Sequence, residues 1–406
     1  MKAKIPTLKP ARVPVMAGDY PGKGPRNRFE SFPWVMALVV LASRVLTTGP
    51  LYFIDGPEHV EAARTATYIV QPPGYWLFNR TIAFFPDPEK GIVFLNWTFS
   101  VLGVVVFYYA ARLLVQQRMA RWGTAVYAAL FYVWFVGGIH STYASQLLFP
   151  VMVFLFMQLH RRQPRLLYLI GAAAAYAIGA GFRPTDGLFL GFMFLYYLIR
   201  RAPVRQAVLS FCLATTLCLV WLVPTIETFA THWGTAVTIG YSGRLIAQVS
   251  PVFHGITYRS LASMSRFVVP LTVAFWPLLV PIFQTLAKLR DDPVKLLWLW
   301  IGPGAAFMLL FYMSHAPYVT FFTAAVVLLA LKHLDSASPR LGTFLLATCL
   351  VSNTVFFLFF VPIRSKSLAV NVLNVYAGKY TRFAIQHQWQ PDLSDLINRD
   401  TLAPKQ

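Results

Sequence analysis

The sequence has 406 residues, of which 57% are hydrophobic and only 12% are charged. This charged share is about half that of a typical soluble protein, so a soluble globular chain is excluded and most of the sequence must lie in lipid. The 35 Lys and Arg residues outnumber the 15 Asp and Glu residues, which gives a net charge of +20. In a soluble protein that excess would indicate nucleic acid, but here the charges must first be placed relative to a membrane.

Eleven apolar segments are candidate transmembrane helices, which need about 20 residues to cross roughly 30 Å of hydrocarbon. They predict an all-α, polytopic membrane protein. In chain order, the segments are 33–54, 92–110, 122–139, 143–159, 166–181, 186–199, 206–226, 267–287, 295–314, 317–331 and 341–362.

Basic residues favour one side of these segments. The N-terminal tail and the turns after the even-numbered segments are rich in Lys and Arg, whereas the short turns near Ser141 and Ala316 have none. Because cytoplasmic loops are enriched in basic residues, the N-terminus is expected in the cytoplasm. We therefore expect a multi-pass protein of a plasma membrane, the inner membrane of a bacterium, with its functional face outside.

This topology divides the chain into three parts. Residues 1–31 form a basic cytoplasmic tail whose composition predicts disorder. Residues 32–362 form the transmembrane domain, with two long outer loops at 55–91 and 225–266. Residues 363–406 form an outer tail.

The first outer loop begins with a carboxylate at the edge of the hydrocarbon, Asp55. Such a carboxyl group has a raised pKa unless it is paired, which suits a general base. Alternatively, Asp55 caps a helix that begins at Pro57, and both roles can coexist. Glu58 would lie on the same helical face. Residues 57–70 are expected to form an amphipathic helix in the membrane interface, with lipid-facing side chains at Val60, Ala63, Thr67 and Ile69.

Other polar residues stand out against their apolar surroundings. Arg44 lies inside the first span, where a cation costs on the order of 3 kcal/mol unless it faces protein or a cavity. It is either a structural partner within the membrane or a functional group. Arg183 and Asp186 lie in the outer turn between the fifth and sixth segments. They form either a simple ion pair or part of a site.

The later outer segments also contain cations. His315 occupies a tight turn, and Arg244 and Arg259 lie in the second long loop. Basic residues are expected mainly on the cytoplasmic side, so their presence on the outer side suggests a bound anion. An anionic lipid surface would also attract them. A single histidine is more often structural.

Several common site patterns are missing from the sequence. There is no phosphate-binding glycine loop, no metal-binding spacing of His or Cys, and no nucleophile elbow. The cytoplasmic turns are too short to hold a nucleotide-binding domain. Chemistry driven by ATP or a nucleotide sugar at the inner side is therefore not expected.

Together, the basic tail, the first span with its arginine, and the acidic residue at its outer end resemble the GT-C superfamily of membrane glycosyltransferases. The nearest branch holds protein O-mannosyltransferases and lipid A aminoarabinose transferases. Three motifs are similar to that branch: Gln71-Pro72-Pro73-Gly74-Tyr75-Trp76, Gly181-Phe182-Arg183-Pro184 and Pro317-Tyr318-Val319-Thr320-Phe321. The sequence departs from the pattern at Gly56, where the family often has Glu, at Gln71, where Lys or His is common, and at Pro317, where Arg is usual.

The resemblance implies an inverting transfer of a sugar from a polyprenyl-phosphate donor to an acceptor on the outer face. Asp55 would be the general base, and Glu58 would orient the acceptor or help to hold a divalent metal, although no cofactor is required. The donor phosphate would be bound by Arg183, Arg244, Arg259 and His315. The substrate would be lined by Gln71, Tyr75, Trp76 and Tyr318, although Tyr75 and Trp76 equally suit an interfacial aromatic belt.

The expected partners are the lipid-linked sugar, the bilayer, and a glycan, lipid or protein acceptor, with no nucleic acid. Two other functions are compatible with the sequence. A ligase or polymerase of lipid-linked glycans would use Arg244 and Arg259 and could dispense with Asp55. A lipid or glycan transporter is disfavoured, because the chain has no repeated halves and few charges within its spans.

Overall fold

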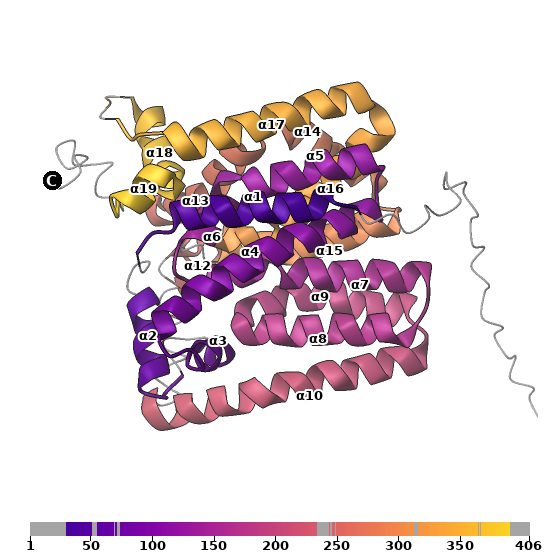
Figure 1. Ribbon diagram of the computed structural model, residues 1–406, viewed down its shortest axis with the longest axis vertical. Helices are drawn as coiled ribbons and strands as arrows, with labels where there is room; N and C mark the ends of the chain where they lie inside the picture. Colours follow the sequence, from indigo (N-terminus) through magenta and orange to yellow (C-terminus); the bar gives the residue numbers. More distant parts are fainter. Residues whose placement is uncertain are drawn as a thin grey trace, which may run out of the picture. The chain divides into compact units, whose positions relative to one another are not determined.

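The computed structural model describes residues 30–50, 55–68, 70, 74–233, 243, 246–247, 249–311, 316–363, 365 and 367–389. The chain divides into two units, Met1–Ser31 and Phe32–Gln406, and all that follows concerns the second. Regular structure in the described part of the chain is helical (Figure 1). Three of the predicted site residues, Gln71, Arg244 and His315, lie outside the described residues, as does most of the predicted tail at 1–31.

The first half of the unit builds most of the membrane-spanning bundle. Its helices and short helical turns are α1 (Phe32–Thr47), α2 (Asp55–Arg64), α3 (Trp76–Ile82), α4 (Pro88–Arg112), α5 (Gln117–Ala129), α6 (Phe131–Gly138), η1 (Thr142–Leu147), α7 (Phe149–Arg162), α8 (Leu166–Phe182), α9 (Pro184–Arg201) and α10 (Val204–Thr228).

The second half completes the bundle and adds two short helices near the C-terminus. It consists of η2 (Phe229–Trp233), α12 (Pro251–His254), α13 (Tyr258–Phe275), η3 (Trp276–Leu278), α14 (Leu279–Gln284), η4 (Thr285–Lys288), α15 (Asp292–Leu310), η5 (Ala316–Val319), α16 (Thr320–Ala337), α17 (Pro339–Phe359), α18 (Leu368–Tyr376), η6 (Gly378–Tyr380) and α19 (Arg382–Gln386).

The predicted all-α, polytopic membrane architecture is confirmed. Among the described helices, six are long and apolar enough to cross a bilayer: α4, η1 with α7, α10, α15, α16 and α17. The helix pair Tyr258–Phe275 and Leu279–Lys288, bent by 105°, makes a seventh if it is one span, and α1 and α8 are shorter apolar helices. Within the described residues, each of the eleven predicted segments overlaps a helix or consecutive helices, while the ends of the first and ninth segments, at 51–54 and 312–314, lie outside those residues.

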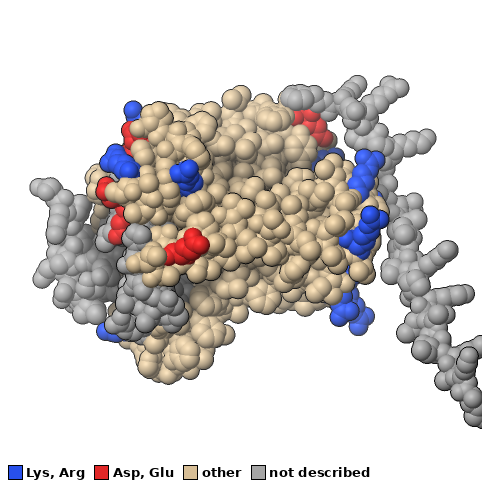
Figure 2. Space-filling view, turned by 90° about the horizontal axis from the view of Figure 1, so that it is seen from below, with Lys and Arg blue, Asp and Glu red and all other residues tan. Residues whose placement is uncertain are grey.

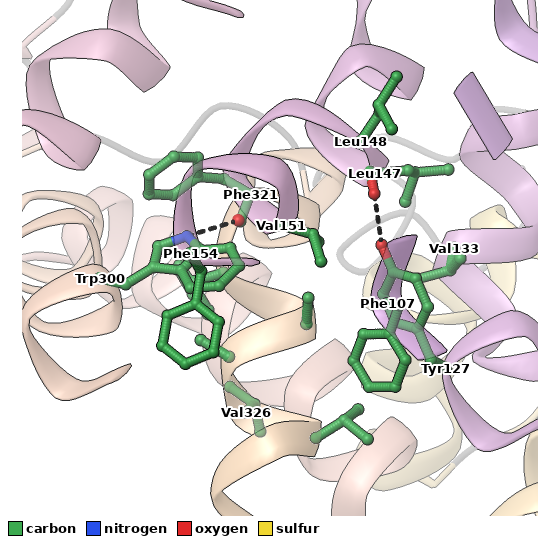
Figure 3. Close-up of a cluster of buried hydrophobic side chains, with 14 of the residues drawn as sticks. Phe107, Tyr127, Val133, Leu147, Leu148, Val151, Phe154, Trp300, Phe321 and Val326 are labelled. Atoms are coloured by element: carbon green, nitrogen blue, oxygen red, sulfur yellow. Dashed lines mark hydrogen bonds between the residues drawn. The ribbon is translucent and has the colours of Figure 1, made fainter. Parts of the chain in front are cut away.

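The core lies where α16 passes through the bundle. Its residues from Thr320 to Leu331 are all buried. Figure 3 shows part of the cluster of buried side chains to which they belong, with two hydrogen bonds within it. The Trp300 indole N–H donates to the Phe321 carbonyl at 3.0 Å, and the Tyr127 hydroxyl donates to the Leu147 carbonyl at 3.0 Å. Because both polar groups find partners, large aromatic side chains can be buried without leaving an unpaired donor.

The two ends of the bundle differ in charge. In Figure 2, the end away from α2 shows mainly Lys and Arg side chains, the end that holds α2 shows side chains of both signs, and the surface between the ends is largely uncharged. The last turns of α4, α7 and α9 supply Arg112, Arg162 and Arg201. We call the end that holds α2 and α3 the α2 end; acidic residues of α2 and α4 lie there. This distribution suits a bundle that crosses a bilayer.

One expectation about the first long loop is wrong. Val60 and Ala63 of α2 do not face lipid but are buried at 4% and 5% exposure in the main hydrophobic core. The apolar face of α2 packs on protein because α3 and α4 lie against it. The helix also begins at Asp55 itself and ends at Arg64, so it is shorter than predicted.

The segment beyond residue 362 is also partly helical. α18, η6 and α19 pack against the bundle, and the buried Tyr380 ring lies edge-on to Phe135 with centroids 5.1 Å apart. The described part of the predicted outer tail therefore packs on the bundle, with η6 against α6, α18 against α13 and α19 against α17.

Candidate active site

Arg183 lies at the junction between α8 and α9. Pro184 opens α9, and a residue that precedes proline avoids the helical conformation. Arg183 accordingly has extended backbone angles, φ −144° and ψ 95°, and separates the two helices. The junction places a long cationic side chain inside the protein at the α2 end, where it is only 2% exposed.

Three tyrosine rings surround the Arg183 guanidinium. Its central carbon lies 4.2 Å from the ring centroid of Tyr143 and 5.5 Å from those of Tyr75 and Tyr318. We call these three residues the tyrosine cage. Aromatic faces attract cations through their quadrupole, and the attraction is stronger where water is excluded. The cage joins three distant parts of the sequence around one charge.

Polar partners complete the surroundings of Arg183. Its Nη1 donates to the Thr142 hydroxyl at 2.6 Å, and its Nε lies 3.5 Å from Asp186 Oδ2. The other Asp186 oxygen accepts a hydrogen bond from Gln146 at 2.9 Å. The ion pair, one of the two alternatives that the sequence left open, is therefore present. Because both charges are buried, removing one partner would leave the other uncompensated.

Tyr75 reaches the cage through an unusual backbone turn. Gly74 has φ +111° and Tyr75 has φ 57°, both in the region that side chains avoid. A Cβ on Gly74 would lie 2.7 Å from Thr225 Cγ2, so only glycine allows the turn to approach α10 this closely. Trp76 follows as the first residue of α3 and is half-buried, with its ring edge-on to Tyr68.

Two of the three carboxylates of α2, Asp55 and Glu58, belong to the part of this helix that lies closest in sequence to its start. Asp55 is close enough to interact electrostatically with Tyr143 of the cage and with Glu58. Partial burial, and then the charge of Asp55, raise the pKa of the Glu58 carboxyl above its ordinary value. The α2 end thus brings a pair of carboxylates near a buried, caged arginine.

The structure brings several of the predicted site residues into one region. Asp55, Glu58, Tyr75, Tyr318 and Arg183 belong to one region, whereas Arg259 is exposed in the first turn of α13.

Sequence reasoning missed Thr142, Tyr143 and Gln146, which hold Arg183 and Asp186. Their signal was a run of polar residues, from His140 to Gln146, between two apolar segments.

No group of three His, Cys, Asp or Glu side chains that could hold a metal occurs among the described residues. Asp55 and Glu58 are two carboxylates of the kind that hard divalent cations prefer, but two alone would need further ligands from substrate or water. Substrate phosphates commonly complete such a shell around magnesium.

No protein-family model matches the sequence, and no curated protein sequence matches it either.

Solved structures do match the fold. ArnT from Cupriavidus metallidurans, bound to undecaprenyl phosphate, superposes with a TM-score of 0.55 at 16% identity, over 76% of this chain and 60% of that one. The Archaeoglobus fulgidus oligosaccharyltransferase tethered to an acceptor peptide gives 0.51 at 12% identity, over 80% and 53%. The same archaeon's AglB, in complex with an inhibitory peptide and dolichol-phosphate, gives 0.50 at 12%, over 89% and 56%.

The chain therefore shares the fold of these ArnT and oligosaccharyltransferase structures, in agreement with the fold that the sequence resemblance implied. It spans between about half and three fifths of the length of these structures. At identities this low the likeness concerns the fold, and function must be argued from the site.

Proposed function

We propose that this protein transfers a sugar from a polyprenyl-phosphate donor to an acceptor hydroxyl, with inversion at the anomeric carbon. Asp55 takes the proton of the acceptor hydroxyl as the new glycosidic bond forms. The bond between the anomeric carbon and the phosphate oxygen breaks, and the electron pair leaves with the polyprenyl phosphate. Arg183 stabilises the negative charge that develops there.

The single observation that carries this proposal is the buried Arg183 inside the tyrosine cage, with Asp55 close enough to interact electrostatically with Tyr143 of that cage. A lipid phosphate needs a cation at the end of a membrane bundle, and a buried guanidinium binds phosphate more strongly than one in water. The ArnT and AglB structures contain undecaprenyl phosphate and dolichol-phosphate, which supports a lipid phosphate for the shared fold. Tyr75, Trp76 and Tyr318 are then suited to line the sugar.

The decisive test is Asp55→Asn, which keeps the size of the side chain but removes the base. We expect transfer to fall about 10²- to 10⁴-fold, the contribution of general-base catalysis, with polyprenyl-phosphate binding and thermal stability retained. Asp87→Asn is the matched control, since Asp87 is a carboxylate at the N-cap of α4 and asparagine also caps helices well. Full activity in Asp55→Asn would rule out the base assignment.

The same assay separates this function from a glycan ligase or polymerase. Arg259→Ala and Arg244→Ala should change transfer little if Asp55 and Arg183 form the centre. Loss of activity in these variants, with Asp55→Asn active, would favour the ligase instead. Repeating the assay with a chelator tests whether Glu58 and Asp55 hold a divalent metal or act alone.

The proposed membrane orientation places the α2 end outside and the N-terminus in the cytoplasm of a bacterium. Lys90 and Arg201 are both exposed, and a cysteine can be introduced at either position. A membrane-impermeant thiol reagent then reports which of the two positions lies outside. We expect labelling of intact cells at position 90 and none at position 201. Labelling at position 201 and not at position 90 would show that the membrane orientation is the opposite of the one proposed.

A further inference from the structure

His59 is a buried histidine of α2 that the proposed chemistry does not use. It follows Glu58 directly, is 2% exposed, and its Nδ1 lies 2.7 Å from Oδ1 of Asn79 in α3. Asn79 Nδ2 donates to the Tyr68 carbonyl at 2.9 Å, which fixes the orientation of the amide. Its oxygen can only accept, so the proton of this hydrogen bond must belong to His59 Nδ1.

The electrostatic setting keeps this imidazole neutral. Burial lowers the pKa of His59 to about 4, the hydrogen bond to Asn79 opposes that shift, and the charge of Arg183 adds to it. At neutral pH the ring therefore has one proton, on Nδ1, and no charge. A second cation next to Arg183 is avoided, while the hydrogen bond between α2 and α3 is kept.

The His59 ring also contacts the residue that brings α3 to the tyrosine cage. It lies edge-on to Tyr75, with ring centroids 5.2 Å apart and an angle of 89°, and packs similarly on Phe78 at 5.2 Å. Tyr75 has the left-handed backbone conformation, which persists only when neighbouring contacts hold it. His59 is thus connected to Glu58 along the chain and to the cage through Tyr75.

We propose that His59 and Asn79 form a neutral latch that fixes α2, with Asp55 and Glu58, against the tyrosine cage around Arg183. His59 is a positioning residue in this arrangement, because it sets the place of Tyr75 and of the α2 carboxylates. This inference rests on the proposed function, since Arg183, which the tyrosine cage surrounds, is taken to bind the phosphate of the donor. A histidine that only fills the core would affect folding but not that binding.

Two substitutions separate the hydrogen bond from the ring. His59→Phe keeps an aromatic ring against Tyr75 but removes the donor and leaves the Asn79 oxygen unpaired. His59→Asn places an amide N–H near the position of Nδ1 and removes the outer part of the ring. His160→Phe is the matched control, because His160 is also buried and hydrogen-bonded, to Tyr197 and Gln206, in a different part of the bundle.

The first measurement is equilibrium binding of undecaprenyl phosphate to the purified full-length protein. We expect His59→Phe to weaken it about tenfold and His59→Asn to weaken it less, while His160→Phe lowers the melting temperature without changing affinity. In the transfer assay the loss should appear in KM for the donor more than in kcat. Unchanged affinity in His59→Phe, with wild-type protein binding normally, would overturn the latch.

A double-mutant cycle with Tyr75→Leu tests the route of the effect. If His59 acts through Tyr75, His59→Phe should weaken binding by less than about twofold once Tyr75 is leucine. Additive effects would show that the two residues act independently and would also overturn the latch. Failure of the wild-type protein to bind undecaprenyl phosphate would instead contradict the proposed function itself, so the two failures are distinguishable.

Discussion

Arg44 and Arg183 are both buried in the membrane bundle, at 1% and 2% exposure, but their surroundings differ. Arg183 has a carboxylate, a hydroxyl and three aromatic faces around it. Arg44 donates to the Ala128 carbonyl at 3.2 Å and to Ser43 at 3.2 Å, and stacks at 5.4 Å on Trp134. In the described part of the chain, no carboxylate forms an ion pair with Arg44.

Two buried polar atoms close to Gly137, Arg44 Nε and Ser100 Oγ, have no hydrogen-bond partner within the described residues. Gly137 lies between them, since a Cβ there would be 2.5 Å from Arg44 Nε and 2.6 Å from Ser100 Oγ. Arg44 is therefore packed between α1, α4 and α6, in the manner of a structural residue.

The contrast shows that burial alone does not mark a functional cation. Arg44 connects neighbouring helices through local contacts, whereas Arg183 gathers residues from positions 75, 143 and 318 and lies near two further carboxylates. That convergence at one end of the bundle is what points to a ligand. Substitutions at the two arginines should therefore have different consequences.

The largest effect is expected at Arg183. Arg183→Gln should weaken undecaprenyl-phosphate binding at least about 100-fold, because it removes the cation nearest the proposed phosphate. It should also destabilise the fold by about 3–5 kcal/mol, since Asp186 would remain buried without its partner. Binding isotherms and thermal unfolding in detergent measure the two effects separately.

The double variant Arg183→Gln with Asp186→Asn separates charge pairing from ligand binding. It removes both charges, so most of the stability should return while binding stays weak. If binding recovered together with stability, Arg183 would be a structural residue like Arg44, and the comparison would fail.

A smaller effect is expected at Arg44. Arg44→Met keeps a long, apolar side chain and leaves no buried carboxylate unpaired, so stability should stay within about 1 kcal/mol of the wild type. Affinity for undecaprenyl phosphate should be unchanged within about twofold. A large loss of affinity with an intact fold would show that Arg44, too, serves the ligand.

The fold and the candidate site could be predicted from the sequence to different extents. Long apolar segments predicted the helices, because in lipid the backbone must satisfy its own hydrogen bonds. Arg183 and Asp186 could be picked out because charges are rare in such surroundings.

The sequence pattern could not tell whether the apolar face of α2 meets lipid or protein, since both are apolar; Val60 and Ala63 show the outcome. Tyr143 and His59 were missed for a related reason, because only the folded chain brings them to Arg183 and Tyr75.

The smallest effect concerns pH and two buried histidines: His59, which packs on Tyr75 of the tyrosine cage, and His140, whose Nδ1 lies 3.9 Å from Glu89 Oε1. Burial lowers the pKa of both His59 and His140 to about 4, below the ordinary value of 6.5. Between these values the unfolded chain binds more protons than the folded one, so the contribution to stability is complete above pH 6.5 and is lost as the pH falls towards 4.

His140→Gln should lower the number of protons that the chain takes up on unfolding by about one, and His59→Asn should lower it by about one more. Unfolding at several pH values in that window measures this number. Only His59 lies at the tyrosine cage, so only its protonation should also weaken undecaprenyl-phosphate binding. Acid sensitivity of binding that persisted in His59→Asn but vanished in His140→Gln would place the ligand nearer to His140 than to His59, and would contradict the role proposed for His59.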